Sequence, residues 1–277
     1  MSAVSEAIRA ANEDGRAALV VYLPAGFPDM DTSRACLEAA AEAGADLLEV
    51  GFPYSDPLMD GPVIQQANQV AMDAGYTPHD NFAMCRDLND RVAIPTLVMT
   101  YYNILWHYQA PDRLAGFAAD AAAAGLSGAI VPDLPVAESG DWSATATAAG
   151  LAKVFLVAST SADDHLAAAA RASDGFVYAT STLGVTGTRE SLSDRAGPLV
   201  SRLRSLTSRP VCVGIGVSTA AHAEAVASFA DGVIVGSAAV RAAADRGPAA
   251  VADLVSALAA GCRSGYRTTE RAAESIR

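Results

Sequence analysis

The sequence lacks the features that a disulfide framework, a metal knuckle or a membrane span would need. Its four cysteines stand far apart with no C-x-x-C pair, so we expect reduced thiols and neither zinc nor disulfides. There is no run of 18 or more apolar residues, which excludes an ordinary membrane-spanning helix. Lys153 is the only lysine, so Schiff-base chemistry would need this residue or the N-terminal amine.

Positive charge is scarce as well. The 277 residues carry 19 Lys and Arg against 31 Asp and Glu, a formal net charge of -12. Such a chain repels the phosphate backbone of nucleic acid and anionic membrane surfaces, so neither is expected as a partner. Residues 1–10 lack the basic head and apolar stretch of a secretory signal. We therefore expect a soluble, cytoplasmic protein.

The chain does show a regular alternation of two kinds of segment. Alanine-rich amphipathic stretches, such as 35–44, 115–125, 144–150 and 220–230, are followed within a few residues by short apolar runs. Most of these stretches close on a glycine, which is typical of helix C-termini. Runs that are apolar at nearly every position are typical of strands buried on both faces of a parallel sheet. Eight strands are predicted, at 18–23, 47–50, 93–99, 128–131, 154–157, 176–179, 211–215 and 232–235.

Eight strand–helix units without a proline- or serine-rich linker favour a single (β/α)8 TIM barrel over two domains. An open doubly wound sheet is the alternative, and it predicts a G-x-G-x-x-G turn after the first strand. The turn at 23–28 instead reads Leu-Pro-Ala-Gly-Phe-Pro. We expect one barrel domain over residues 1–262, followed by a polar tail at 263–277 that frays. The active site of a barrel lies at the C-terminal ends of its strands.

Two carboxylates belong to the end of the second predicted strand and its loop. Glu49 lies among apolar residues, where burial raises the pKa of a carboxyl toward the range that acid–base catalysis at pH 7 requires. The alternative is a structural glutamate that caps a loop or pairs with a buried arginine. Asp60 directly precedes Gly61-Pro62, a typical helix start. Its alternative is an N-cap or an Asp-Gly turn.

Glycines gather at the ends of the last three predicted strands. They form Gly-Val-Thr-Gly-Thr at 184–188, Gly-Ile-Gly-Val-Ser at 214–218, and Gly236-Ser237 at the start of a helical stretch. A net-acidic chain is expected to hold a phosphate through backbone N–H groups and a helix N-terminus. Barrels commonly bind phosphate after strands seven and eight. Tight strand-to-helix turns also use glycine, which is the alternative explanation.

The remaining reactive side chains do not converge. Lys153 begins the fifth predicted strand, at the barrel end away from the expected site, so a Schiff-base aldolase fits poorly. The histidines share no ligand spacing and fall in predicted helices or their flanks, which disfavours a metal site and a Ser-His-Asp triad. They are His79, His107, His165 and His222.

Residues 48–61 resemble the signature segment of the tryptophan synthase alpha subunit family, with Glu in the second strand, Ser-Asp-Pro in the loop and Asp-Gly at its end. Blocks similar to those of the family follow in the same order at 99–103, 131–135, 176–178, 184–187, 214–218 and 236–237. The likeness extends from residue 15 to about 262. It implies a (β/α)8 barrel and a lyase of L-tryptophan biosynthesis that cleaves indole-3-glycerol phosphate to indole and D-glyceraldehyde 3-phosphate. The resemblance implies no metal or organic cofactor.

The resemblance also implies roles for individual residues. Glu49 matches the acid–base residue that serves both proton transfers. Asp60 matches the residue that accepts the indole N–H and stabilises positive charge on the ring, so it is expected to stay ionised in a polar, solvated loop. Thr186 matches a residue of the sixth loop that contacts Asp60 on closure. The implied pocket residues are Tyr22, Ile64, Tyr101 and Tyr178, and the implied phosphate cradle is Gly187, Gly216, Gly236 and Ser237.

The family works with a beta subunit, a pyridoxal phosphate enzyme that takes indole through an internal tunnel. The resemblance therefore implies an alpha2beta2 assembly in which Pro53, Asp56 and the segment around Pro135 meet the partner. The alternatives are a stand-alone indole-3-glycerol phosphate lyase, another phosphate-binding barrel such as an epimerase, or a non-catalytic subunit that only activates the beta chain. Some residues depart from those common in the family and bear on loop closure and pocket shape, namely Met59, Thr182, Leu183 and Ile215.

Overall fold

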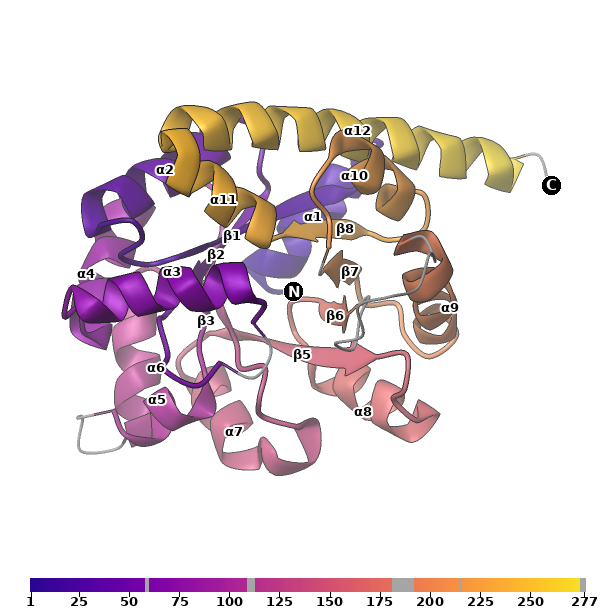
Figure 1. The fold of residues 1–277 in the computed structure, drawn as a ribbon. Coiled ribbons are helices and arrows are strands. Elements are labelled where there is room, and N and C mark those ends of the chain that lie inside the picture. Colours follow the sequence, from indigo (N-terminus) through magenta and orange to yellow (C-terminus); the bar gives the residue numbers. More distant parts are fainter. Residues whose placement is uncertain (58–59, 109–112, 181–191, 215, 275–277) are drawn as a thin grey trace.

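The computed structural model describes residues 1–57, 60–108, 113–180, 192–214 and 216–274. Its strands form one closed parallel barrel in chain order, in which β8 pairs with β1 (Figure 1). The predicted TIM barrel is therefore confirmed. The strands are β1 Ala18–Pro24, β2 Leu47–Gly51, β3 Thr96–Met99, β4 Gly128–Ile130, β5 Ala152–Ala158, β6 Val177–Thr180, β7 Val211–Gly214 and β8 Gly232–Val235.

Helices surround the barrel, and the long α12 runs along the outside against α10, α2 and α11. The helices are α1 Ala3–Glu13, α2 Met30–Glu42, α3 Pro62–Asp73, α4 Pro78–Asn89, α5 Tyr102–Trp106, α6 Arg113–Ala123, α7 Gly140–Ala148, α8 Asp163–Ala172, α9 Leu192–Arg204, α10 Ala220–Ala227, α11 Ser237–Arg246 and α12 Pro248–Glu274, with a 3₁₀ turn at Val136–Glu138.

The strands are buried on both faces, as their composition predicts. Every residue of β1 and β2 is buried. One core lies between the strands and the helices, and a second fills the barrel interior. In that second core Val4 and Ile8 of α1 pack against Ala18 and Leu47, which begin their strands. Helix α1 thus closes the N-terminal mouth of the barrel, at the end opposite the expected site.

The predicted glycine stops have the expected geometry. Gly44, Gly125 and Gly150 follow α2, α6 and α7 with φ of 110°, 79° and 77°. Such left-handed values are readily adopted by glycine and strained for other residues. The glycines therefore end the helices and turn the chain into the next strand.

Most predicted strand boundaries agree with the structure to within one or two residues, and two predictions differ by more. The third strand begins at Thr96 and not at residue 93, because Pro95 has no N–H to donate to a sheet. Helix α12 continues to Glu274 and so includes most of the segment that we expected to fray. The domain boundary at residue 262 stays a prediction. Within the part of the chain that the structure describes, no helix combines the length and apolarity needed to cross a membrane.

Candidate active site

A pocket opens at the C-terminal ends of the strands and gathers most of the predicted site residues. The lining residues come from six strands, from the loop between β2 and α3, from α3 itself, from the turn after β7 and from the start of α11. Thr186, Gly187 and the family departures Met59, Thr182, Leu183 and Ile215 lie outside the described residues. The pocket is lined by Tyr22, Glu49, Asp60, Gly61, Ile64, Met99, Leu156, Tyr178, Gly216, Ile234, Gly236 and Ser237.

Glu49 lies on β2 at the floor of this pocket. Its side chain is 1% exposed, and its Oε2 has no hydrogen-bond partner among the described residues. Burial, reinforced by the nearby charge of Asp60, raises the pKa of Glu49 to about 8. The carboxyl is therefore mostly protonated at pH 7 and can donate a proton. The unpartnered oxygen disfavours a structural capping role.

Two tyrosines flank Glu49, each lying against a strand glycine. A Cβ on Gly51 would lie 2.2 Å from the hydroxyl oxygen of Tyr22, and one on Gly214 would lie 2.3 Å from that of Tyr178. Each glycine thus makes room for a phenol ring. Burial raises the pKa of both hydroxyls well above the usual value, so both stay protonated. The rings add apolar surface around Glu49 and help to exclude water from it.

Asp60 lines the same pocket, where the loop after β2 enters α3. The Nε2 of Gln65 donates to its backbone oxygen at 2.9 Å, and the Nδ2 of Asn68 donates to its Oδ2 at 3.4 Å. Burial raises the pKa of Asp60 to about 6, while hydrogen bonds from Tyr101 and Asn68 act in the lowering direction. Asp60 is half-buried rather than fully solvated, because α3 and Tyr101 cover part of its carboxyl. Asp60 nevertheless remains mostly ionised at pH 7.

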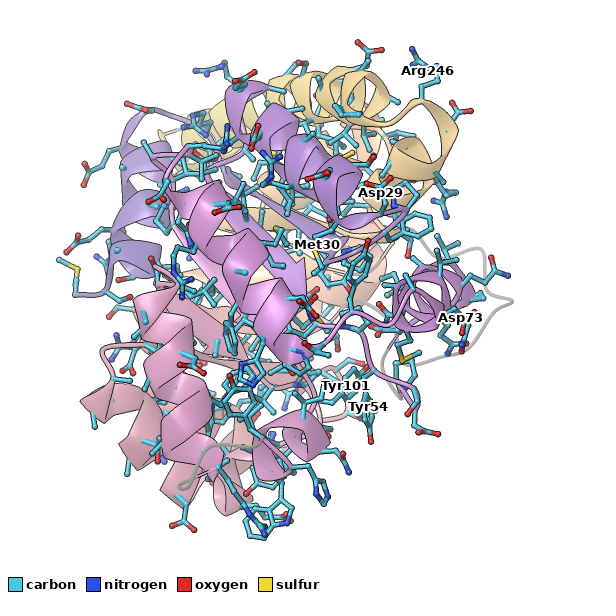
Figure 2. The ribbon with its side chains drawn as sticks, turned by 90° about the vertical axis from the view of Figure 1, so that its left-hand side faces the viewer. Asp29, Met30, Tyr54, Asp73, Tyr101 and Arg246 are labelled. Atoms are coloured by element: carbon cyan, nitrogen blue, oxygen red, sulfur yellow. The ribbon has the colours of Figure 1, made fainter. Side chains whose placement is uncertain are left out.

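Tyr101 reaches the site through Asp60 and is not among the residues that line the pocket. Its ring stacks on that of Tyr54 with centroids 5.1 Å apart and an angle of 25° between the planes. Figure 2 shows the two residues side by side. This stacking joins the loop after β2 to the end of β3, and it holds the Tyr101 hydroxyl near Asp60.

The far end of the pocket consists of backbone. Gly236 is the N-cap of the ten-residue helix α11, and Gly236 and Ser237 both face the pocket. Gly216 lines the same end with φ of 101°. The N-terminus of a helix offers unpaired N–H groups and the positive end of the helix dipole. This end of the pocket is therefore suited to an anion such as a phosphate ester.

The three residues predicted to meet a partner lie at the same end of the barrel. Pro53 and Asp56 follow β2, and Pro135 follows β4. Pro53 is half-buried, whereas Asp56 and Pro135 are exposed. These loops follow the C-terminal ends of their strands, the end at which the pocket opens, and the contact with a partner stays a prediction.

The side chain of Lys153 lies away from the pocket. It is 8% exposed near the start of β5, where its Nζ pairs with Asp174 and donates to the Oγ1 of Thr147 at 2.7 Å. Among the residues that the structure describes, no three His, Cys, Asp or Glu side chains are grouped so as to hold a metal ion.

Several pocket residues were not predicted from the sequence. Met99, Leu156 and Ile234 line the pocket from β3, β5 and β8. They look like ordinary core residues in the sequence, and only the strand register identifies them, since Met99 pairs with Gly51 and Leu156 with Tyr178. Asn68, which contacts Asp60 without lining the pocket, also has no sequence signal beyond an amide within an amphipathic helix.

Comparison with known proteins places this fold and site in context. A family model described as "Tryptophan synthase alpha chain" matches residues 8–264. The chain is 47% identical over 267 residues to the tryptophan synthase alpha chain of Streptomyces avermitilis, with 95% of each chain covered. It is 49% identical over 268 residues to that of Acidothermus cellulolyticus, with 95% of this chain and 98% of the relative covered.

Solved structures give a consistent picture. The aminoacrylate-bound form of tryptophan synthase from M. tuberculosis matches with a TM-score of 0.86 and 40% identity, covering 95% of this chain and 100% of that one. The tryptophan synthase complex from Pyrococcus furiosus matches with a TM-score of 0.77 and 30% identity, covering 88% of this chain and 98% of that one.

Proposed function

Because the chain belongs to the tryptophan synthase alpha chain family, it is the lyase of the alpha reaction in tryptophan biosynthesis, and we propose that Glu49 and Asp60 carry out its chemistry. The reaction cleaves indole-3-glycerol phosphate to indole and D-glyceraldehyde 3-phosphate. One observation carries the proposal: a carboxyl with a pKa of about 8 and another with a pKa of about 6 face one pocket. Near pH 7 the first is mostly protonated and the second mostly ionised, as acid–base cleavage requires.

Glu49 performs two proton transfers in this proposal. Its protonated carboxyl first gives a proton to C3 of the indole, which places a positive charge on the ring. The resulting carboxylate then removes the proton of the hydroxyl on the carbon bonded to C3. The electrons of that O–H bond form the aldehyde C=O, and those of the broken C–C bond return to the ring. Glu49 ends protonated, so the cycle balances without another acid.

Asp60 stabilises the cation that forms between these two transfers. Its ionised carboxyl accepts the indole N–H, and the charge that develops on the ring lies beside a fixed negative charge. Tyr22, Ile64 and Tyr178 line the pocket beside the two carboxyl groups. We assign them to the indole and glycerol parts of the substrate, where they exclude water from the proton transfers.

The phosphate end of the substrate is held by backbone N–H groups of Gly216, Gly236 and Ser237 in this proposal. The position of these residues at the N-terminus of α11 and in the turn after β7 supports this assignment. Neither lysine nor arginine is among the described residues that line the pocket. Backbone binding explains how a chain with a net charge of -12 accommodates a phosphate ester. Thr186 and Gly187 keep the roles that the family resemblance implies.

A beta subunit is the expected partner of an alpha chain of this family. We propose an alpha2beta2 assembly with Pro53, Asp56 and the segment around Pro135 at the contact, supported by their place in loops that follow the C-terminal ends of β2 and β4. We further propose one barrel domain over residues 1–262 and a cytoplasmic location. The four cysteines, all buried and unpaired, support a reducing compartment.

The test is indole release from indole-3-glycerol phosphate by the purified chain, with and without the beta subunit. Glu49→Gln and Asp60→Asn should each lower turnover by about two to four orders of magnitude while the fold is retained. Near-normal turnover in either variant contradicts its assigned role. Full turnover without stimulation by the beta subunit would indicate a stand-alone lyase, and activation of the beta chain without indole release would indicate a non-catalytic subunit.

A further inference from the structure

We infer that Asn68 is a positioning residue whose buried amide N–H holds the Asp60 carboxylate in place and favours its ionised form. Asn68 does not line the pocket and acts through Asp60. The inference rests on the proposed function of Asp60 and adds a residue that the family resemblance did not identify.

The contact arises from the geometry of α3. Asn68 lies on the buried face of this helix and is 2% exposed. Its Nδ2 donates to the Oδ2 of Asp60 at 3.4 Å, while the exposed Gln65, almost one turn earlier, donates to the backbone oxygen of Asp60 at 2.9 Å. Helix α3 therefore holds both the backbone and the side chain of the residue that precedes its N-cap.

The amide of Asn68 is incompletely paired, and this shows what determines its orientation. Its Oδ1 is buried without a hydrogen-bond partner among the described residues. A reversed amide would place this oxygen against the carboxylate of Asp60, so the charge of Asp60 dictates which end faces it. The buried neighbours of Asn68 on α3 are Ala67 and Ala71. An apolar side chain would avoid the unpaired oxygen, so the polar group is explained by its contact with Asp60.

A neutral donor suits the proposed chemistry better than a cation. The amide N–H, like the hydroxyl of Tyr101, stabilises Asp60 in its ionised form. Neither group adds positive charge, so Asp60 keeps the net negative charge that it presents to the indole ring. An arginine or lysine at position 68 would neutralise that charge.

Other titratable groups face Asp60, and the test must separate their titration from the effect of Asn68. The charge of Asp60 raises the pKa of Glu49 on β2, of Tyr22 on β1 and of Tyr178 on β6, while Tyr101 donates a hydrogen bond to Asp60. None of these residues is altered by a substitution at position 68. Activity should fall at low pH as Asp60 becomes protonated. A change in the pH at which this fall occurs in such a variant therefore reports on Asp60.

The experiment measures kcat/KM for indole release against pH, with the beta subunit present, for wild type, Asn68→Leu and Asn81→Leu. Asn81 is a matched control because it is also 2% exposed with an unpartnered Oδ1, but it lies on α4 outside the pocket. Asn68→Leu should move the low-pH fall in kcat/KM to higher pH. The variant should lower kcat/KM about tenfold at pH 6 and by less at pH 8. Asn81→Leu should leave the profile unchanged.

The outcomes separate this inference from the proposed function. A loss that is equal at every pH, or the same shift in Asn81→Leu, contradicts the role of Asn68. If Asp60→Asn abolishes turnover while Asn68→Leu leaves the low-pH fall in kcat/KM in place, Asn68 has no such role and the proposed function stands. If Asp60→Asn itself retains normal turnover, the proposed function fails. Should Asn68→Leu not fold, Asn68→Ala provides the same comparison.

Discussion

The hydroxyl oxygen of Tyr22 occupies the space that a Cβ on Gly51 would need, at a distance of 2.2 Å. Tyr22 and Gly51 belong to neighbouring strands, and Glu49 lies two residues before Gly51 on the same face of β2. The missing Cβ therefore lets the phenol ring lie beside the catalytic carboxyl. The packing around Glu49 depends on this glycine as much as on the tyrosine.

Gly51→Ala should displace the ring of Tyr22 and lower indole release about tenfold, with a loss of roughly 1–3 kcal/mol in the free energy of unfolding from overpacking. The measurement is turnover together with denaturant unfolding. Gly140→Ala is the control, because a Cβ there meets nothing within 4 Å. In a Tyr22→Leu background, Gly51→Ala should cause a much smaller loss of turnover and of unfolding free energy, since the colliding ring is absent. Equal losses of turnover and stability in both backgrounds would contradict a collision between the new Cβ and the ring of Tyr22.

Glu49→Gln should stabilise the fold at high pH. Burial raises the pKa of Glu49 from its usual 4.5 to about 8 in the folded state. Below about pH 4.5, Glu49 is protonated in both the folded and the unfolded chain, so its burial carries no ionisation penalty. Between about pH 4.5 and 8 only the unfolded chain ionises, so wild-type stability falls by up to roughly 1.4 kcal/mol per pH unit as pH rises. Glutamine does not titrate, so the variant should gain roughly 2–4 kcal/mol over wild type between pH 5 and 8.

Urea unfolding of both proteins across this pH range measures the difference. Glu6→Gln, which neutralises an exposed residue of α1, is the control for the loss of a charge. A stability difference between Glu49→Gln and wild type that does not change with pH would indicate that Glu49 is ionised in the folded protein.

Ser237→Asp should weaken substrate binding without weakening the fold. A carboxylate at the start of α11 would compete with the phosphate for the same N–H groups, so KM for indole-3-glycerol phosphate should rise at least about tenfold. An acidic residue at a helix N-terminus is itself favourable, so the melting temperature should not fall. Ser2→Asp, at the N-cap of α1 at the opposite end of the barrel, is the matched control. An unchanged KM in Ser237→Asp would contradict the assigned phosphate subsite.

The sequence predicts the barrel well because each strand–helix unit carries its own signals. Gly44 and Gly125 mark helix ends, and the apolar run at β2 marks a strand that is buried on both faces. Glu49 is found for the same reason, since a single carboxyl in such a run stands out. The boundary at Thr96 differs because one proline, Pro95, shortens the strand.

The parts of the site that sequence reasoning missed depend on contacts between distant segments. The partial burial of Asp60 could not be predicted, because Tyr101 reaches it from the end of β3 and Asn68 from two turns along α3. Leu156 and Ile234 line the pocket only through strand register around the closed barrel. These relationships are set by the three-dimensional arrangement, and no local pattern encodes them.

The central claim is that Glu49 is protonated and Asp60 ionised in the same pocket near pH 7. Carbon-13 NMR titration of the side-chain carboxyl groups tests it most directly, with Glu49→Gln and Asp60→Asn used to assign the two signals. The account predicts a pKa of about 8 for Glu49 and about 6 for Asp60. A Glu49 signal that titrates near the usual 4.5 would contradict it.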